Sequence, residues 1–177
     1  MIILTIVLAV IALPFLIALF VKKEYTIERG IDIQQSREVV FDYLKYVRNT
    51  NNFSVWVMAD PNSRRQYIGT DGNVGFIYTW DSDDKQVGAG EQEITSIIDG
   101  KKIEFEIRFI RPFKGKAISY METTSVDENT THVRWVFKNV MNYPMNIMGL
   151  FLNFDKLLGN DQLTSLQNLK NILETGR

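Results

Sequence analysis

The segment from Pro144 to Glu174 constrains the fold of this chain most, because its apolar residues recur at helical spacing. Leucine repeats at steps of three and four in its later part, at Leu163, Leu166, Leu169 and Leu173, which defines one helix face. An earlier stripe points in a different direction and consists of Ile147, Phe151, Phe154 and Leu158. We therefore predict two helical pieces joined at a bend at Gly159-Asn160, with Asn160 or Asp161 capping the second piece.

A helix with so apolar a face needs a broad surface to pack on, and the residues before it predict a sheet. Apolar residues there recur with a period of two, and turn residues separate the runs. Strands are expected at 25–33, 64–69, 74–81, 88–98, 102–111, 116–126 and 131–140. A helix of about three turns is expected after Ser36. This order predicts an α+β fold in which an antiparallel sheet curls around the C-terminal helix.

Residues 1–21 form an apolar run without a charged side chain. About twenty apolar residues, each rising roughly 1.5 Å, are enough to cross a bilayer core. A signal peptide would instead show a basic start and a cleavage site of small residues. We therefore expect a transmembrane anchor at 1–21 and a folded domain at 22–177. Because Lys22 and Lys23 follow the run, the positive-inside rule predicts a single-pass membrane protein with its domain in the cytoplasm.

Composition excludes several classes of function. The chain has 20 basic and 21 acidic residues and no basic tail, so it lacks the positive field of a nucleic-acid-binding protein. Cysteine is absent, which excludes disulfides and thiolate chemistry. With His132 as the single histidine, a multi-histidine metal site is excluded as well. We expect no metal, no cofactor and no nucleic-acid partner.

Several short pieces of the sequence, taken in order, resemble the START/Bet v 1-like superfamily. They are YTIER (25–29), VFDYL (40–44), NFSVW (52–56), DPN (60–62), GNVGFIYTW (72–80), GAGE (88–91), FIRPF (109–113) and LQNLK (166–170). The resemblance is strongest to the bacterial SRPBCC branch, a polyketide cyclase-type family with a membrane-spanning N-terminus. One departure is Phe53, where relatives often carry tryptophan. The resemblance implies a helix-grip fold whose hydrophobic cavity, between sheet and C-terminal helix, holds lipids, sterols or polyketide-like molecules in characterised relatives.

Large aromatic residues are the candidates for lining such a cavity. Strand parity places these side chains on the concave face: Trp56, Tyr78, Trp80, Phe105, Phe109 and Trp135. Phe151, with Met148, Leu152 and Leu166, is expected to form the opposite wall. The alternative interpretation is that all of these side chains fill the core.

Polar residues give weaker candidates. Glu122 lies in the middle of a strand between Met121 and Thr123 and is the one weak catalytic candidate. His132 should face outward, because the apolar register of its strand runs through the odd-numbered residues. Glu91 and Glu93 share a face, and a solvated outer face is favoured over a carboxylate pair that shares a proton.

The sequence thus favours a membrane-anchored START-like domain that binds a hydrophobic or amphipathic small molecule without catalysis. One alternative is an enzyme of the cyclase, dehydratase or hydrolase kind, which needs an ionisable group buried in the cavity. The other is a protein-interaction module like the co-chaperone relatives of this fold, for which a contiguous exposed apolar patch is expected.

Overall fold

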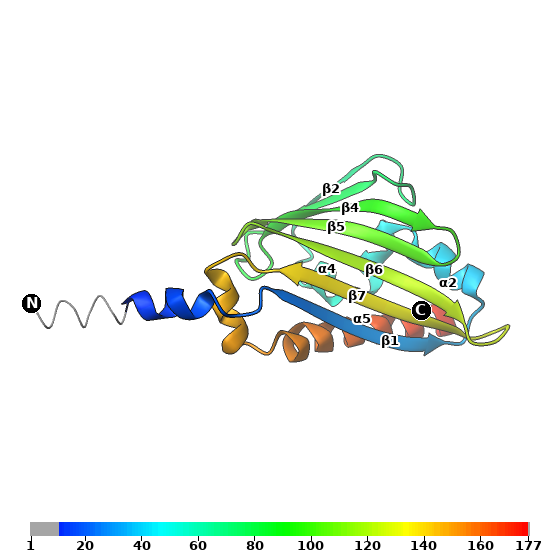
Figure 1. The fold of residues 1–177 in the computed structure, drawn as a ribbon. Coiled ribbons are helices and arrows are strands. Elements are labelled where there is room, and N and C mark those ends of the chain that lie inside the picture. Colours follow the sequence, from blue (N-terminus) through cyan, green and yellow to red (C-terminus); the bar gives the residue numbers. More distant parts are fainter. Residues whose placement is uncertain (1–10, 177) are drawn as a thin grey trace, which may run out of the picture.

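The computed structural model describes residues 11–176 and contains one seven-stranded antiparallel sheet (Figure 1). The strands are β1 (Glu24–Ile33), β2 (Arg64–Ile68), β3 (Ile77–Asp81), β4 (Ala89–Ile98), β5 (Lys102–Arg111), β6 (Gly115–Ser125) and β7 (Thr131–Val140). Their spatial order is β1-β7-β6-β5-β4-β3-β2, so β2 to β7 form a meander and β1 pairs with β7. The predicted antiparallel sheet is confirmed.

Two groups of helices cover the concave side of the sheet. Between β1 and β2 lie α2 (Arg37–Leu44), η1 (Val47–Asn49), α3 (Thr50–Phe53) and α4 (Val55–Met58). After β7 come η2 (Met145–Leu150) and the long α5 (Phe154–Thr175). Figure 1 shows α5 running along the sheet beside β1 and β7. The α+β helix-grip arrangement that the sequence predicts is therefore present.

Strand alternation determines which side chains form the core. In β5, Ile103 and Phe105 are buried, whereas Glu104 lies on the other face. Leu166 and Leu169 of α5 are fully buried in the same apolar cluster. The hydrophobic effect on these inward faces holds the sheet onto α5.

The C-terminal helix differs from its prediction, because α5 continues without a break through Gly159. Asn153 caps the start of α5, because its side chain accepts a hydrogen bond of 2.9 Å from the backbone N–H of Lys156. A Cβ atom at residue 159 would collide with the guanidinium of Arg29 on β1. This glycine therefore permits close packing of helix and sheet, and the bend lies earlier, between η2 and α5.

The membrane prediction is wrong. Residues 1–10 of the expected anchor lie outside the described residues, and within residues 11–176 no helix is long and apolar enough to cross a membrane. The described part of the N-terminal segment is helical at residues 11–18. The helix ends where Asn146 of η2 donates hydrogen bonds to the carbonyls of Ala18 (2.6 Å) and Val21 (2.9 Å). The expectation of a single-pass protein with a cytoplasmic domain is withdrawn.

Candidate functional site

A cavity of about 320 Å³ lies between the concave face of the sheet and the helices. Its walls come from β3 to β7, from α2 to α4 with the loops beside them, and from Leu158 of α5. The lining residues are Leu44, Thr50, Ser54, Trp56, Val57, Ala59, Ser63, Tyr78, Trp80, Gln86, Val87, Gln92, Phe105, Ile107, Phe109, Ser119, Met121, Trp135, Phe137 and Leu158. None of these described residues is charged. The volume is at the lower end of the range of about 300–1,000 Å³ that is typical of ligand pockets.

Six of the seven aromatic candidates line this cavity, namely Trp56, Tyr78, Trp80, Phe105, Phe109 and Trp135. The indoles of Trp56 and Trp135 meet edge to face, with ring centroids 5.3 Å apart. Hydrogen bonds fix both, since Trp135 Nε1 donates to Ser119 Oγ (2.9 Å) and Trp56 Nε1 donates to Asp161 Oδ2 (3.2 Å). Aromatic rings thus form much of the cavity wall, and hydrogen bonds fix the orientation of two of them. That these residues bind a ligand stays a prediction.

The seventh aromatic candidate, Phe151, and the catalytic candidate, Glu122, lie outside the cavity. Phe151 follows η2 and is 80% exposed, because the bend before α5 turns it away from the sheet. In the cavity wall, Leu158 of α5 takes the place that Phe151 was expected to occupy. Glu122 lies on the outer face of β6, where its carboxylate accepts a hydrogen bond of 2.9 Å from Arg134 Nε. Its neighbours Met121 and Thr123 point inward instead.

The remaining ionisable candidates also lie on the outer face. Glu106, Glu91 and Glu93 surround Arg108 at 2.6, 2.5 and 2.8 Å, and these hydrogen bonds raise the pKa of the Arg108 guanidinium. His132 Nδ1 on β7 lies 2.6 Å from Asp32 Oδ1 on the adjacent edge strand β1. No three His, Asp or Glu side chains gather as potential metal ligands within residues 11–176.

Polar groups in the cavity wall were the part of the site that the sequence analysis missed. Thr50, Ser63 and Ser119 are engaged, since their hydroxyls donate to the carbonyls of Val47 (2.6 Å), Asp60 (2.8 Å) and Val136 (3.2 Å) respectively. Tyr78 is 4% exposed, and burial raises the pKa of its phenol to about 12. Gln92 lies opposite Tyr78 on the neighbouring strand. The sequence could have indicated that Gln92 points inward, because Glu91 and Glu93 on either side of it point outward and side chains alternate along a strand.

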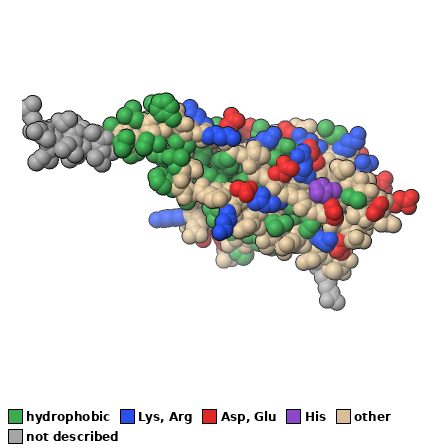
Figure 2. Space-filling model, turned by 60° about the horizontal axis from the view of Figure 1, so that its bottom comes forward, with side chains coloured by type: hydrophobic (Ala, Val, Ile, Leu, Met, Phe, Trp, Pro, Cys, Tyr) green, Lys and Arg blue, Asp and Glu red, His purple; other side chains and the backbone are tan. Residues whose placement is uncertain are grey.

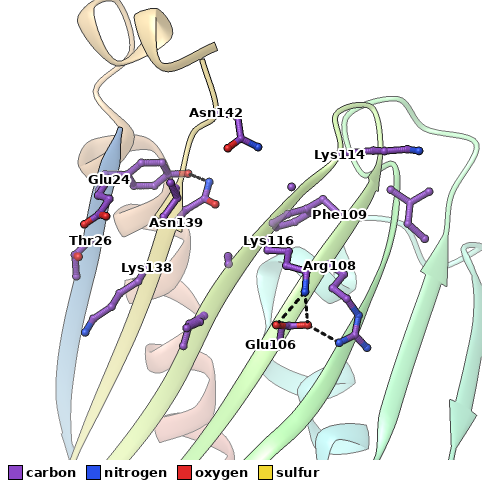
Figure 3. A pocket seen from close by; sticks show the side chains of 16 residues that line it. Glu24, Thr26, Glu106, Arg108, Phe109, Lys114, Lys116, Lys138, Asn139 and Asn142 are labelled. Carbon is purple, nitrogen blue, oxygen red and sulfur yellow. Dashed lines mark hydrogen bonds and ion pairs between the residues drawn. The ribbon is translucent and has the colours of Figure 1, made fainter. Parts of the chain in front are cut away.

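A second hollow, of about 920 Å³, lies at the end of the sheet where β6 and β7 separate (Figure 3). It is more open, and charged side chains form much of its wall. Glu106 there accepts hydrogen bonds from Arg108 (2.6 Å) and Lys116 (3.2 Å). Because these charges pair with one another in a solvent-exposed groove, the smaller and more enclosed cavity is the better candidate for a ligand.

No family model and no curated protein matches the chain. Many solved structures do, and three of them illustrate the likeness, each at low identity. The Aha1 dimer from Colwellia psychrerythraea is 18% identical, with a TM-score of 0.58 over 86% of this chain and 98% of that one. Truncated norcoclaurine synthase from Thalictrum flavum is 8% identical, with a TM-score of 0.60 over 86% and 94%.

The third is the di-domain ARO/CYC StfQ of the steffimycin biosynthetic pathway, which is 11% identical with a TM-score of 0.61. That match covers 86% of this chain and 51% of StfQ, so this chain spans about half of the larger protein. Likeness at such identities is evidence of fold alone. The chain has a START/Bet v 1-like helix-grip fold.

Proposed function

We propose that the domain of residues 22–177 binds a hydrophobic or amphipathic small molecule, without catalysis, between the sheet and α5. The observation that carries this proposal is the cavity of about 320 Å³, whose lining is mostly aromatic and aliphatic and includes no charged residue among those described. A ligand that buries apolar surface there gains about 25 cal/mol per Å². The ligand class is lipid or polyketide-like, as in characterised relatives within the superfamily that the sequence resembles.

The structural neighbours support a small-molecule role for this part of the fold. Norcoclaurine synthase has been solved in complex with dopamine and hydroxybenzaldehyde, and StfQ belongs to the steffimycin biosynthetic pathway. Both point to aromatic or polyketide-like compounds as the first ligands to test.

The binding role is favoured over a cyclase or hydrolase role because acid–base chemistry needs a positioned ionisable group. The best candidates, Glu122 and His132, face away from the cavity and pair with Arg134 and Asp32. Among the described lining residues Tyr78 alone has a titratable side chain, and its phenol, with a pKa that burial raises to about 12, is protonated at neutral pH.

The interaction-module alternative has one observation in its favour. Figure 2 shows hydrophobic side chains gathered over the N-terminal helix and the adjoining part of the domain. Phe20 is 90% exposed, and Leu150, Phe151 and Leu157 are exposed as well. An exposed apolar patch of this kind is typical of an interaction surface.

The chain contains a built-in reporter for the cavity, because all three of its tryptophans line it. We expect the neutral probe N-phenyl-1-naphthylamine, added to the full-length protein, to quench tryptophan emission by energy transfer. Quenching should saturate at one probe per chain. Quenching that does not saturate would contradict the proposal and favour the interaction module.

A further inference from the structure

Two polar side chains on the floor of the cavity have no partner in the described protein. Tyr78 of β3 and Gln92 of β4 are directly paired across the two strands, and both line the cavity. Neither the phenol of Tyr78 nor the amide of Gln92 makes a hydrogen bond with any residue from 11 to 176. The two groups therefore form one polar spot on an otherwise apolar floor.

Three hydroxyls of the wall, those of Thr50, Ser63 and Ser119, are already bonded to backbone carbonyls. Ser54 and Gln86 also line the cavity without a side-chain hydrogen bond among the described residues, but they lie outside the paired strands β3 and β4. Both groups are accessible to solvent, since the buried side-chain atoms without a partner among the described residues are Asn146 Oδ1 and Gln162 Oε1. A ligand that covers the two groups without pairing with them leaves them unsatisfied, which is unfavourable, whereas a ligand atom that pairs with them avoids this penalty. A ligand that offers hydrogen-bonding capacity to the floor is consequently preferred over one that is apolar throughout.

The chemistry of the spot is neutral. Burial raises the pKa of Tyr78 to about 12, so its phenol is a hydrogen-bond donor at neutral pH, and the Gln92 amide both donates and accepts. Arg65, on the neighbouring strand β2, is directed elsewhere. Its N–H groups donate to Ser63 Oγ, Asn51 Oδ1 and the carbonyls of Val57 and Asp60. Arg65 acts on Tyr78 through its charge but donates no hydrogen bond to it, so a carboxylate buried on the floor would lack a direct ion-pair partner.

We infer that the ligand carries a neutral ketone or hydroxyl oxygen, which binds to Tyr78 and Gln92 while its apolar part contacts the three tryptophans. This inference rests on the proposed function and narrows it. A polyketide-like or phenolic ring compound has such an oxygen, whereas an ionised fatty acid presents a carboxylate. The cavity is thus selective for neutral oxygenated ligands.

Three probes of nearly equal shape test the inference on the full-length protein. They are 2-acetylnaphthalene (a ketone), 2-isopropenylnaphthalene (a hydrocarbon) and 2-naphthoate (a carboxylate), and each competes with N-phenyl-1-naphthylamine. We expect the ketone to bind about three- to tenfold more tightly than the hydrocarbon, as one or two net hydrogen bonds would provide, and the carboxylate to bind most weakly.

Variants separate the polar spot from the rest of the cavity. Tyr78→Phe and Gln92→Met should each reduce the advantage of the ketone and leave the affinity for the hydrocarbon unchanged. Tyr120→Phe on β6 and Gln66→Met on β2 change the same residue types on the outer face, and all three affinities should stay as in the wild type.

The possible outcomes distinguish the two proposals. If the hydrocarbon binds as tightly as the ketone, or the carboxylate binds most tightly, the inference is wrong and the binding function stands. If both cavity variants keep the full advantage of the ketone, the polar spot is not its site and the inference is also wrong. If no probe competes and N-phenyl-1-naphthylamine itself does not bind, the proposed function fails and the inference fails with it.

Discussion

Tyr78 is a residue whose ionisation the fold opposes. Its pKa is about 12, against about 10 for an exposed tyrosine, because burial disfavours the phenolate more than the positive charge of Arg65 favours it. Since the folded state holds this proton more tightly than the unfolded state, its contribution to stability is complete below about pH 10. That contribution is lost as the pH rises from there through about 12.

We predict that this late ionisation is visible in the phenolate absorbance of the folded protein. The difference between the titration of the wild type and that of Tyr78→Phe should be a single ionisation with its midpoint near pH 12. A difference curve centred near the ordinary tyrosine pKa of about 10 would show that the phenol is exposed to water.

Ser119 is a second residue with a defined task, because its hydroxyl accepts the indole N–H of Trp135 at 2.9 Å. We predict that Ser119→Ala destabilises the protein by about 1–3 kcal/mol, since it leaves a buried donor unpaired. The free energy of unfolding in urea measures this. Ser125→Ala, at the exposed end of the same strand, is the matched control and should stay within about 0.5 kcal/mol of the wild type. Equal stabilities of the two variants would contradict the role of the hydrogen bond.

At the scale of elements, β4 depends on a glycine that lets Trp80 lie across it. A Cβ atom at Gly90 would stand 2.5 Å from the indole of Trp80 and 2.7 Å from the backbone carbonyl of Arg108. We predict that Gly90→Ala costs about 1–3 kcal/mol by overpacking, although alanine is ordinarily better than glycine inside a strand.

Thermal unfolding with circular dichroism measures this cost, and Gly115→Ala is the control. Gly115 begins β6, and an added Cβ there has nothing within 4 Å. The control should unfold at the wild-type temperature or slightly above it. If Gly90→Ala is as stable as the control, the close approach of Trp80 to β4 is not a constraint on the fold.

The strands were the most predictable elements, because a period of two fixes both their existence and their inward face. β5 and β7 have the predicted bounds, and the inward aromatics follow from their parity. The continuity of α5 through Gly159, where we predicted a bend, could not be foreseen, since a glycine that ends a helix and one that admits Arg29 look alike in sequence. Phe151 was misplaced as a consequence.

At the scale of the whole molecule, the sequence could not decide whether the inward aromatics fill the core or leave a cavity. Tyr78, Phe105 and Trp135 belong to the buried core cluster and also line the cavity, so both interpretations describe part of the structure. The remaining space depends on how closely α4 and α5 approach the sheet, which is a property of long-range packing. Long-range packing also decides which hydroxyl groups of the cavity wall form hydrogen bonds within the protein, so the sequence could not predict these either.

An open cavity has a consequence for the stability of the entire domain, because a ligand that binds only the folded state stabilises it. At a free ligand concentration of about 100 times Kd the gain is about 2.7 kcal/mol. For a chain of this size each kcal/mol raises Tm by about 2–4 °C. We therefore predict that 2-acetylnaphthalene at that level raises Tm by about 5–10 °C.

Two isoleucine-to-tryptophan variants test whether the rise in Tm comes from binding in the cavity. Ile107→Trp puts an indole into the cavity and should abolish the shift, whereas Ile118→Trp, on the outer face of the adjacent strand, should keep it. If Ile107→Trp folds, as circular dichroism would show, and retains the full shift, the probe binds elsewhere. The exposed apolar side chains around Phe20 and Phe151 would then be its site. The cavity and the exposed apolar patch are alternative sites for the same apolar probe. Loss of the Tm shift in Ile107→Trp would therefore favour a ligand-binding domain, and its survival would favour an interaction module.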